Sequence, residues 1–348
     1  MRILAGLIIL MLVFGCTGGG GQVTPPEENK TNATNITNQT GPPVSIIIGE
    51  QKNQTTGGNA SEELPPPPPP ELKGMQYEYR PDEVFGVYFI DVGGPGLQGD
   101  AILIKKGDLD VLVDAGSAEK GSKVVDFLRS RDVDDIEVLV STAADPRRYG
   151  GMDAVADAFK IEEFWWNGDT FGDTAYSAVV GRMTEAAGSE DVKIVEDGFS
   201  MDLNGMNFTA INPPREGRVD DVNNDAIVLR IVDRNYSMLL TSGIQTGAQG
   251  PLINTKTEMI EVKVLQAPYY GVGAGTSDIG LFLIKSKPEV VIISGSSDES
   301  AVNGGSREPF KRLMRQYGIP YYENYVSGTI RVSSDGQNYT VQSLGKGS

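Results

Sequence analysis

Two short clusters of aspartate, arginine and tyrosine hold the side chains best suited to bind or react with another molecule. One is the run Asp145-Pro146-Arg147-Arg148-Tyr149, and the other is the pair Tyr269-Tyr270. A guanidinium binds carboxylates and phosphates through paired hydrogen bonds, and a tyrosine offers a flat ring with a polar tip. The two clusters could therefore form a pocket for an anionic small molecule.

The residue types also restrict the metal chemistry open to this chain. It contains no histidine and a single cysteine, Cys16, so a Cys/His zinc site and an internal disulfide are both excluded. An oxygen-only site for Mg²⁺ or Ca²⁺ could still form from four aspartates. These are Asp91, Asp114, Asp145 and Asp153. We predict no metal and no cofactor, and keep this carboxylate site as the alternative.

The overall charge limits the partners of the protein. The formal net charge is −17, from 30 Lys and Arg against 47 Asp and Glu. Binding to a phosphate backbone requires clustered basic charge, so the balance argues against nucleic acid as a partner. A helix expected over residues 307–317 carries Arg307, Lys311, Arg312 and Arg315, and we interpret these as a solvated face.

The first residues resemble a lipoprotein signal. Arg2 precedes an apolar run, Ile3 to Phe14, that is shorter than the roughly 20 residues a membrane-spanning helix needs. Val13-Phe14-Gly15-Cys16 then resembles a lipobox, in which a small residue precedes the cysteine that is acylated. We predict a signal peptide over residues 1–15 and a lipid on Cys16 that anchors the protein to the outer face of the cytoplasmic membrane. An uncleaved signal anchor is the alternative, and it too places the body outside the cytosol.

Residues 16–76 are expected to form a disordered tether. This stretch is rich in Gly, Pro, Thr and Asn, and such a composition buries too little apolar surface to offset the entropy of ordering. Its run Pro65 to Pro70 favours a stiff polyproline II spacer. Val44 to Ile48 are apolar, but nothing nearby is expected to complete a sheet with them. Six glycosylation sequons begin at Asn29, Asn32, Asn35, Asn38, Asn53 and Asn59. They indicate a glycosylated stalk of the kind found on archaeal surfaces, or a polar linker in which sequons arise by chance.

The globular body is predicted over residues 77–348. Alternating apolar residues indicate strands at Val84 to Asp91, Ala101 to Lys105 and Asp110 to Asp114, and Ile136 to Thr142 is a continuous apolar strand. Helical periodicity appears in several later segments. These are Ser122 to Arg131, Met152 to Phe159, Thr174 to Ala187, Ser277 to Lys285 and Arg307 to Tyr317. The mixture predicts a layered α/β protein.

The order of these segments resembles the metallo-β-lactamase superfamily, most closely its ComEC-type branch of competence proteins. Phe89 to Gly93 followed by Gln98 to Ile104 looks like the family opening FLDVGQGDAILI, with four residues inserted. Further similar segments are Val111 to Gly116, Ile136 to Gly151, Asn224 to Leu229, Leu239 to Gln245, Leu265 to Gly271, Glu289 to Ser294 and Gly328 to Val332. The resemblance spans most of the body and implies an αββα sandwich.

The positions that would ligate metal in this family hold other residues here. The HxHxDH loop of the enzymes falls on Ala143, Asp145, Arg147 and Arg148. The bridging aspartate falls on Gly243, and a paired histidine motif falls on Tyr269 and Tyr270. Of these residues only Asp145 could bind a metal, because a guanidinium does not release its proton to become a ligand. The resemblance therefore implies a degenerate metal site and a pseudoenzyme.

Two interpretations of the replaced residues remain open. In the first, the arginines neutralise carboxylates that once faced metal, and the tyrosines fill the vacated volume. In the second, Arg147, Arg148, Tyr149, Tyr269 and Tyr270 form a pocket for an anionic ligand. The function predicted is a surface-tethered, non-catalytic module that binds an unidentified protein or small molecule. The alternative is a metal-dependent hydrolase of the nuclease or phosphodiesterase kind that uses the carboxylate site.

Overall fold

The computed structural model describes residues 46–48, 75–92, 99–272, 277–297 and 305–347. The chain divides into two compact units, residues 1–41 and 42–348, and every described residue belongs to the second. The predicted signal peptide, Cys16, the polyproline run and the six sequons lie outside the described residues. No helix in the described part of the chain has both the length and the apolar character that crossing a bilayer requires.

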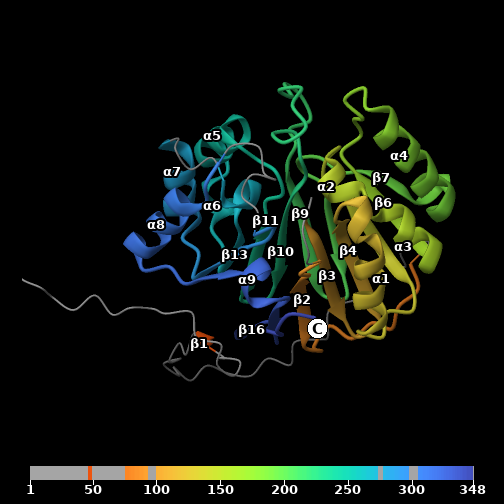
Figure 1. Ribbon diagram of the computed structural model, residues 1–348, viewed down its shortest axis with the longest axis horizontal. Coiled ribbons are helices and arrows are strands. Elements are labelled where there is room, and N and C mark those ends of the chain that lie inside the picture. The colour runs from red at the N-terminus through yellow and green to blue at the C-terminus, as the bar shows by residue number, and fades with distance from the viewer. Residues whose placement is uncertain (1–45, 49–74, 93–98, 273–276, 298–304, 348) are drawn as a thin grey trace, which may run out of the picture. The chain divides into compact units, whose positions relative to one another are not determined.

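Two mixed β-sheets form the centre of the second unit (Figure 1). The first sheet has the order β1 (Ile46–Ile48), β16 (Tyr339–Ser343), β15 (Ile330–Ser334), β2 (Phe85–Phe89), β3 (Ala101–Lys106), β4 (Leu109–Ala115), β5 (Ile136–Ser141), β6 (Ile161–Trp166) and β7 (Val192–Ile194). The second has the order β14 (Tyr321–Glu323), β13 (Val290–Ile293), β12 (Val264–Gln266), β11 (Tyr236–Leu240), β10 (Val228–Asp233), β9 (Met206–Asn212) and β8 (Ser200–Leu203).

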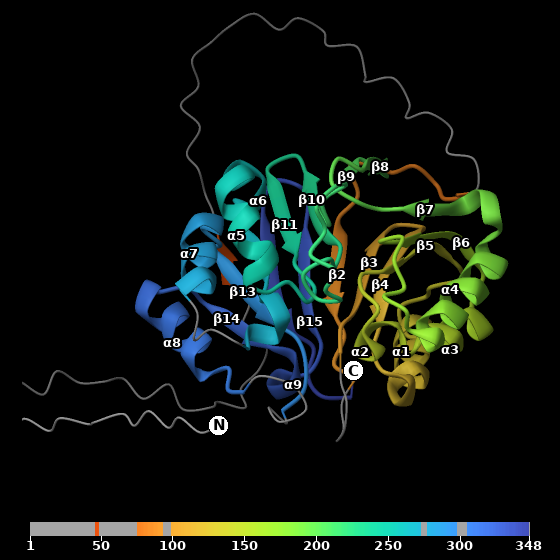
Figure 2. The same cartoon turned by 90° about the horizontal axis from the view of Figure 1, so that it is seen from above.

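Helices cover the outer face of each sheet, so the layers run helix, sheet, sheet, helix (Figure 2). The first sheet is covered by α1 (Gly121–Arg129), α3 (Met152–Ala158) and α4 (Thr174–Ala187), with the short η1 (Ala118–Lys120), α2 (Pro146–Tyr149) and η2 (Ser189–Asp191) nearby. The second is covered by α5 (Thr246–Thr255), α6 (Thr257–Ile260), α7 (Ser277–Ser286) and α8 (Glu308–Tyr317). Two further short helices are η3 (Pro268–Gly271) and α9 (Asn324–Ser327). The predicted αββα sandwich is confirmed.

The sequence pattern explains why both faces of each central strand are buried. In β4, Val111 and Val113 enter the core between the two sheets, while Leu112 points to the opposite face and packs under the helices. Every residue of β4 and β5 is buried, and their central residues, Val111 to Val113 and Val138 to Val140, are apolar, as expected for strands covered on both sides. The helix layer over the second sheet encloses a third apolar cluster in the same way.

Strand direction brings the chemically important loops to one edge. Strands β4, β5, β6 and β7 run parallel, and so do β11, β12, β13 and β14. The carboxyl ends of parallel strands share an edge of their sheet, and ligand sites of α/β proteins form there. Side-chain contacts between Thr142 and Ser242, which follow β5 and β11, join these edges of the two sheets.

Two predictions about individual segments are wrong. Val44 to Ile48 was expected to find no partner, yet its residues Ile46–Ile48 form β1, which pairs antiparallel with β16. The partner comes from the far end of the chain, so no local pattern could have indicated it. Arg307 was expected on a solvated helix face, but it precedes α8 and is fully buried.

Candidate functional site

The site is built around Arg148, whose side chain is fully buried among three aspartates. Its Nη1 donates a hydrogen bond to Asp145 Oδ2 at 2.8 Å. Its Nη2 lies 3.1 Å from Asp100 Oδ2 and its Nε lies 3.7 Å from Asp114 Oδ2, and these two contacts are ion pairs without hydrogen-bond alignment. One cation thus joins three segments that are far apart in the sequence.

A very short helix aims two consecutive arginines at this centre. Asp145 caps α2, because its Oδ1 accepts a hydrogen bond from the backbone N of Arg147 at 2.9 Å, and Pro146 occupies the first helical position. The same carboxylate also accepts hydrogen bonds from the Arg147 side chain, the shortest from Nη2 at 2.6 Å. Arg147 is 9% exposed and therefore forms the outer layer over the buried Arg148.

Asp114 holds the end of the first sheet against the second. Its two carboxylate oxygens accept hydrogen bonds from the backbone N and the Oγ1 of Thr142, at 2.9 and 2.6 Å. Since the Thr142 hydroxyl is used in this way, the Ser242 hydroxyl donates to Thr142 Oγ1, at 2.6 Å. The chain of contacts Asp114, Thr142 and Ser242 therefore crosses from one sheet to the other.

Asp100 makes a second connection between the sheets, and the sequence reasoning did not select it. Its Oδ1 accepts a hydrogen bond from the hydroxyl of Ser294, which follows β13 in the second sheet. Asp100 belongs to the segment Gln98-Gly99-Asp100 that supported the family resemblance, and that position was the available signal. A Cβ on Gly99 would lie 1.4 Å from the Arg147 carbonyl oxygen, so only glycine allows this approach to α2.

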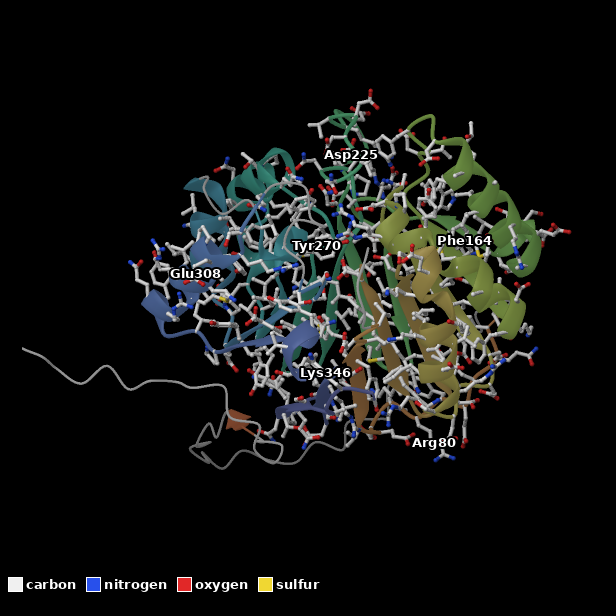
Figure 3. All side chains as sticks on the ribbon, in the orientation of Figure 1. Arg80, Phe164, Asp225, Tyr270, Glu308 and Lys346 are labelled. Atoms are coloured by element: carbon white, nitrogen blue, oxygen red, sulfur yellow. The ribbon has the colours of Figure 1, made fainter. Side chains whose placement is uncertain are left out.

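Two tyrosines of η3, which follows β12 of the second sheet, close the centre, and Figure 3 labels Tyr270. The Tyr270 ring lies 4.7 Å from the Arg148 guanidinium and 5.1 Å from that of Arg147, and Tyr269 lies 5.6 Å from Arg147. Both tyrosines have a left-handed backbone, with φ of 45° and 59°. Such conformations cost about 1–3 kcal/mol each in residues other than glycine and persist where the surroundings impose them.

Arg307 supports this tyrosine loop from behind. Its Nε donates to the carbonyl oxygen of Tyr270 at 2.9 Å and its Nη1 donates to that of Ser296 at 2.7 Å. The guanidinium also lies 4.6 Å from the ring of Tyr325. Arg307 therefore fixes the loop that carries Tyr270, which is why it is buried despite its place in a basic run.

Burial and ion pairing act in opposite directions on the aspartates. Burial raises the pKa of Asp114 to about 7, although the charge of Arg148 opposes this rise. Burial would also raise the pKa of Asp145, but the charge of Arg148 and the hydrogen bonds and charge of Arg147 outweigh it, so this pKa lies below its ordinary value. Asp145 is therefore held more firmly in its ionised form than Asp114.

The residues at the family's metal-ligand positions do not fit a metal. Ala143 is buried in the apolar core beside the second sheet, and a Cβ on Gly243 would lie 2.8 Å from Asn223 Oδ1 and 3.3 Å from Arg148 Nη1. The side chains of Asn223 and Arg148 thus leave little room for a side chain at position 243. Within the described ranges, no three acidic or cysteine side chains are arranged to hold a metal ion.

Among the described residues, the four aspartates of the alternative carboxylate site do not form a group of three or more that could hold a metal ion. Asp114 and Asp145 both contact Arg148, but Asp153 lies on α3 and pairs with Arg182 of α4, 3.5 Å away. The backbone N of Asp91 binds Thr329 Oγ1 at 3.1 Å. These contacts do not favour the carboxylate alternative.

Tyr149 is separated from the other candidate ligand-binding residues. Its hydroxyl donates to Asp173 Oδ2 at 3.3 Å, and its ring packs against that of Tyr176, 4.9 Å away. Burial, together with the charge of Asp173, raises the pKa of Tyr149 to about 12. The remaining four residues, Arg147, Arg148, Tyr269 and Tyr270, are brought together and are buried. Their mutual contacts favour the interpretation in which arginine neutralises the carboxylates and tyrosine fills the volume.

The chain is similar in sequence to two known proteins. No family model matches the chain. It is 23% identical over 270 residues to the uncharacterized protein YcaI of Escherichia coli, covering 76% of this chain and 32% of the relative. It is 25% identical over 258 residues to competence protein ComA of Neisseria gonorrhoeae, covering 73% and 33%. The chain therefore spans about a third of the length of these two relatives.

Solved structures similar to this chain include two described as metallo-β-lactamase-fold or metallo-hydrolase proteins. YhfI from Bacillus subtilis gives a TM-score of 0.48 at 10% identity, covering 72% of this chain and all of that one. Igni18 from Ignicoccus hospitalis, described as a metallo hydrolase, gives 0.46 at 12% identity, covering 71% and 98%.

We predict that Arg148→Met destabilises the protein by about 3–5 kcal/mol, because it leaves buried carboxylates without a counter-charge. The loss should be larger at pH 8 than at pH 5. Asp114 has a folded pKa raised to about 7, so acid restores its proton and lowers the charge left unpaired. Urea unfolding at both pH values measures the effect.

Arg182→Met, which removes an exposed ion pair, is the matched control and should lower the unfolding free energy by less than about 1 kcal/mol. Equal losses in the two variants would contradict the prediction.

A second prediction concerns Tyr270, whose buried hydroxyl has no hydrogen-bond partner among the described residues. Tyr270→Phe keeps the ring over Arg148 and should change the unfolding free energy by less than about 1 kcal/mol. Tyr270→Leu removes the ring and should cost more, since cation–π contacts contribute up to about 2 kcal/mol when desolvated. Thermal or urea unfolding of both variants decides it, and a large loss in Tyr270→Phe would show that the hydroxyl has a structural role.

Proposed function

We propose that this protein is a surface-tethered, non-catalytic member of the metallo-β-lactamase-like proteins, and that its body serves as a binding module. One observation carries the proposal. The fully buried guanidinium of Arg148 is surrounded by Asp100, Asp114 and Asp145, in the place that the family resemblance assigns to metal. A guanidinium supplies the positive charge of a metal but offers no open coordination position to activate water.

The energetics of the centre support a structural role for the cation. Three buried carboxylates without a partner would strongly destabilise the fold, and two arginines offset most of this charge. Hydrolysis by an activated water needs about three protein ligands and one open position, and the residues here provide neither. In this proposal the protein shares its fold and ancestry with competence proteins but does not act on DNA.

Metal analysis of the full-length protein tests the proposal directly. After dialysis we expect a substoichiometric content of zinc, manganese and iron. We also expect no hydrolysis of bis(p-nitrophenyl) phosphate above the buffer rate with added Zn²⁺, Mn²⁺ or Mg²⁺. Asp145→Asn is the paired variant and should match the parent protein in this assay. Stoichiometric metal, together with phosphodiesterase activity that Asp145→Asn abolishes, would establish the hydrolase alternative instead.

The tether forms the second part of the proposal. The lipobox-like Val13-Phe14-Gly15-Cys16 and the polar residues that follow it support a lipid anchor on the outer face of the cytoplasmic membrane. Stable anchoring requires more than one acyl chain, and an acylated amino-terminal cysteine can supply them. The body would then reach its partner at the end of a long polar linker.

We predict that Cys16→Ser moves the protein from the membrane fraction to the soluble fraction of its native host, because the acylation site is lost. Cell fractionation followed by immunoblotting measures the distribution. Ser45→Cys in the Cys16→Ser background moves the thiol away from the signal and should not restore membrane association. Retention of Cys16→Ser in the membrane would favour an uncleaved signal anchor.

A further inference from the structure

A cleft lies on the outer side of α2, the helix that carries the two buried arginines. It has a volume of about 590 Å³ and is enclosed by η1, α2, α3 and α4. This volume is within the range of about 300–1,000 Å³ that small-molecule sites occupy in proteins. Arg147 and Arg148 do not line it, so the cleft is separate from the Arg148 centre.

Small and apolar residues of η1, α2 and α4 form the walls of the cleft. They are Ala118, Pro146, Ala175, Ala178 and Val179. The Tyr149 side chain, fixed by Asp173 through its hydroxyl, contributes an aromatic wall. These residues leave a broad apolar surface that suits a ring or a short hydrocarbon group.

The charged residues around the cleft are mostly acidic. Glu119 and Asp153 line it, and Asp157 and Asp173 lie next to lining residues. The basic side chain among the lining residues is Arg182, and it is already paired with Asp157 at 2.5 Å and with Asp153 at 3.5 Å. The local balance is therefore negative, in line with the net charge of −17 of the whole chain.

Asp153 presents a carboxylate that a ligand in the cleft can reach. Its side chain is 50% exposed, while its Oδ1 is covered by protein atoms and lies 3.5 Å from Arg182 Nη1. The exposed part of the carboxylate can therefore accept a hydrogen bond from a ligand in place of water. A positively charged donor gains most, because it also pairs with the surrounding carboxylates.

We propose that this cleft binds a small organic cation, namely an apolar or aromatic group that carries an ammonium. The apolar group lies on the alanine and proline wall, and the ammonium faces Glu119 and Asp153. The inference rests on the proposed function in that it treats the domain as a binding module, and it assigns the ligand to the outer side of α2 in place of the Arg148 centre.

Three probes of similar shape and different charge test the assignment on the full-length protein. They are phenethylamine, its neutral N-acetyl derivative and the anion 3-phenylpropionate, titrated by ligand-observed NMR. We expect phenethylamine to bind about tenfold more tightly than the neutral probe, and the anion to bind most weakly. Equal binding of all three, or preference for the anion at Arg182, would overturn the proposal.

Two tryptophan variants of α4 locate the binding. Ala178 is exposed and lines the cleft, so Ala178→Trp should fill it and abolish phenethylamine binding without unfolding the protein. Ala186 is exposed on the same helix and does not line the cleft, so Ala186→Trp should bind as the parent does. Binding that survives Ala178→Trp would place the probe elsewhere and refute the assignment.

A charge variant completes the test. Glu119→Gln with Asp153→Asn removes two carboxylates and should reduce the affinity for phenethylamine about tenfold while leaving that for the neutral probe unchanged. No change for phenethylamine would contradict the role of these carboxylates. Metal content is measured independently, so a metal-bearing protein would refute the proposed function, whereas absence of probe binding would refute only this inference.

Discussion

The interaction on which the rest of the structure depends is the burial of Arg148 among Asp100, Asp114 and Asp145. Each aspartate belongs to a different segment of the first sheet's edge, and two of them also contact the second sheet through Ser294 and through Thr142 and Ser242. The ion cluster therefore fixes the distance between the sheets at the edge where ligand sites form in this class of fold. Its tyrosine cover and the support from Arg307 are arranged around that one guanidinium.

The ion pairs of the cluster explain how several charged side chains can be buried in one place. Isolated charges in a protein interior are unstable, but a charge with several partners of opposite sign can be accommodated. Four of the non-glycine residues with a left-handed backbone, Asp114, Ser242, Tyr269 and Tyr270, lie next to the cluster. Conformations of this kind persist only where the surroundings impose them, so the packing and ion pairs of the cluster hold these loops in a geometry that their side chains alone would not select.

Much of the fold follows from local sequence patterns. The strands β3 and β4 and the bounds of α4 were predicted, because the controlling contacts are repeated or short in range. Helix α5 was missed, since Pro251 and its glycines hide any apolar period. The pairing of β1 with β16 and the contact between Ser294 and Asp100 join residues far apart in the chain, and a single sequence gives no measure of such distances. For the site, the sequence identified Arg147, Arg148 and the two tyrosines. Which of these side chains are buried, and which residues they contact, could be learned only from the structure.

A cation that belongs to the polypeptide has one further consequence. A metal centre can be emptied by a chelator, filled with the wrong ion, or left incomplete when supply is short, and its assembly releases protons from its ligands. Arg148 is incorporated during synthesis and stays charged at every pH the protein meets. The two sheets are thus joined by a counter-ion that cannot dissociate, so the edge of this sandwich is complete as soon as the chain folds, whatever the metal content of its surroundings.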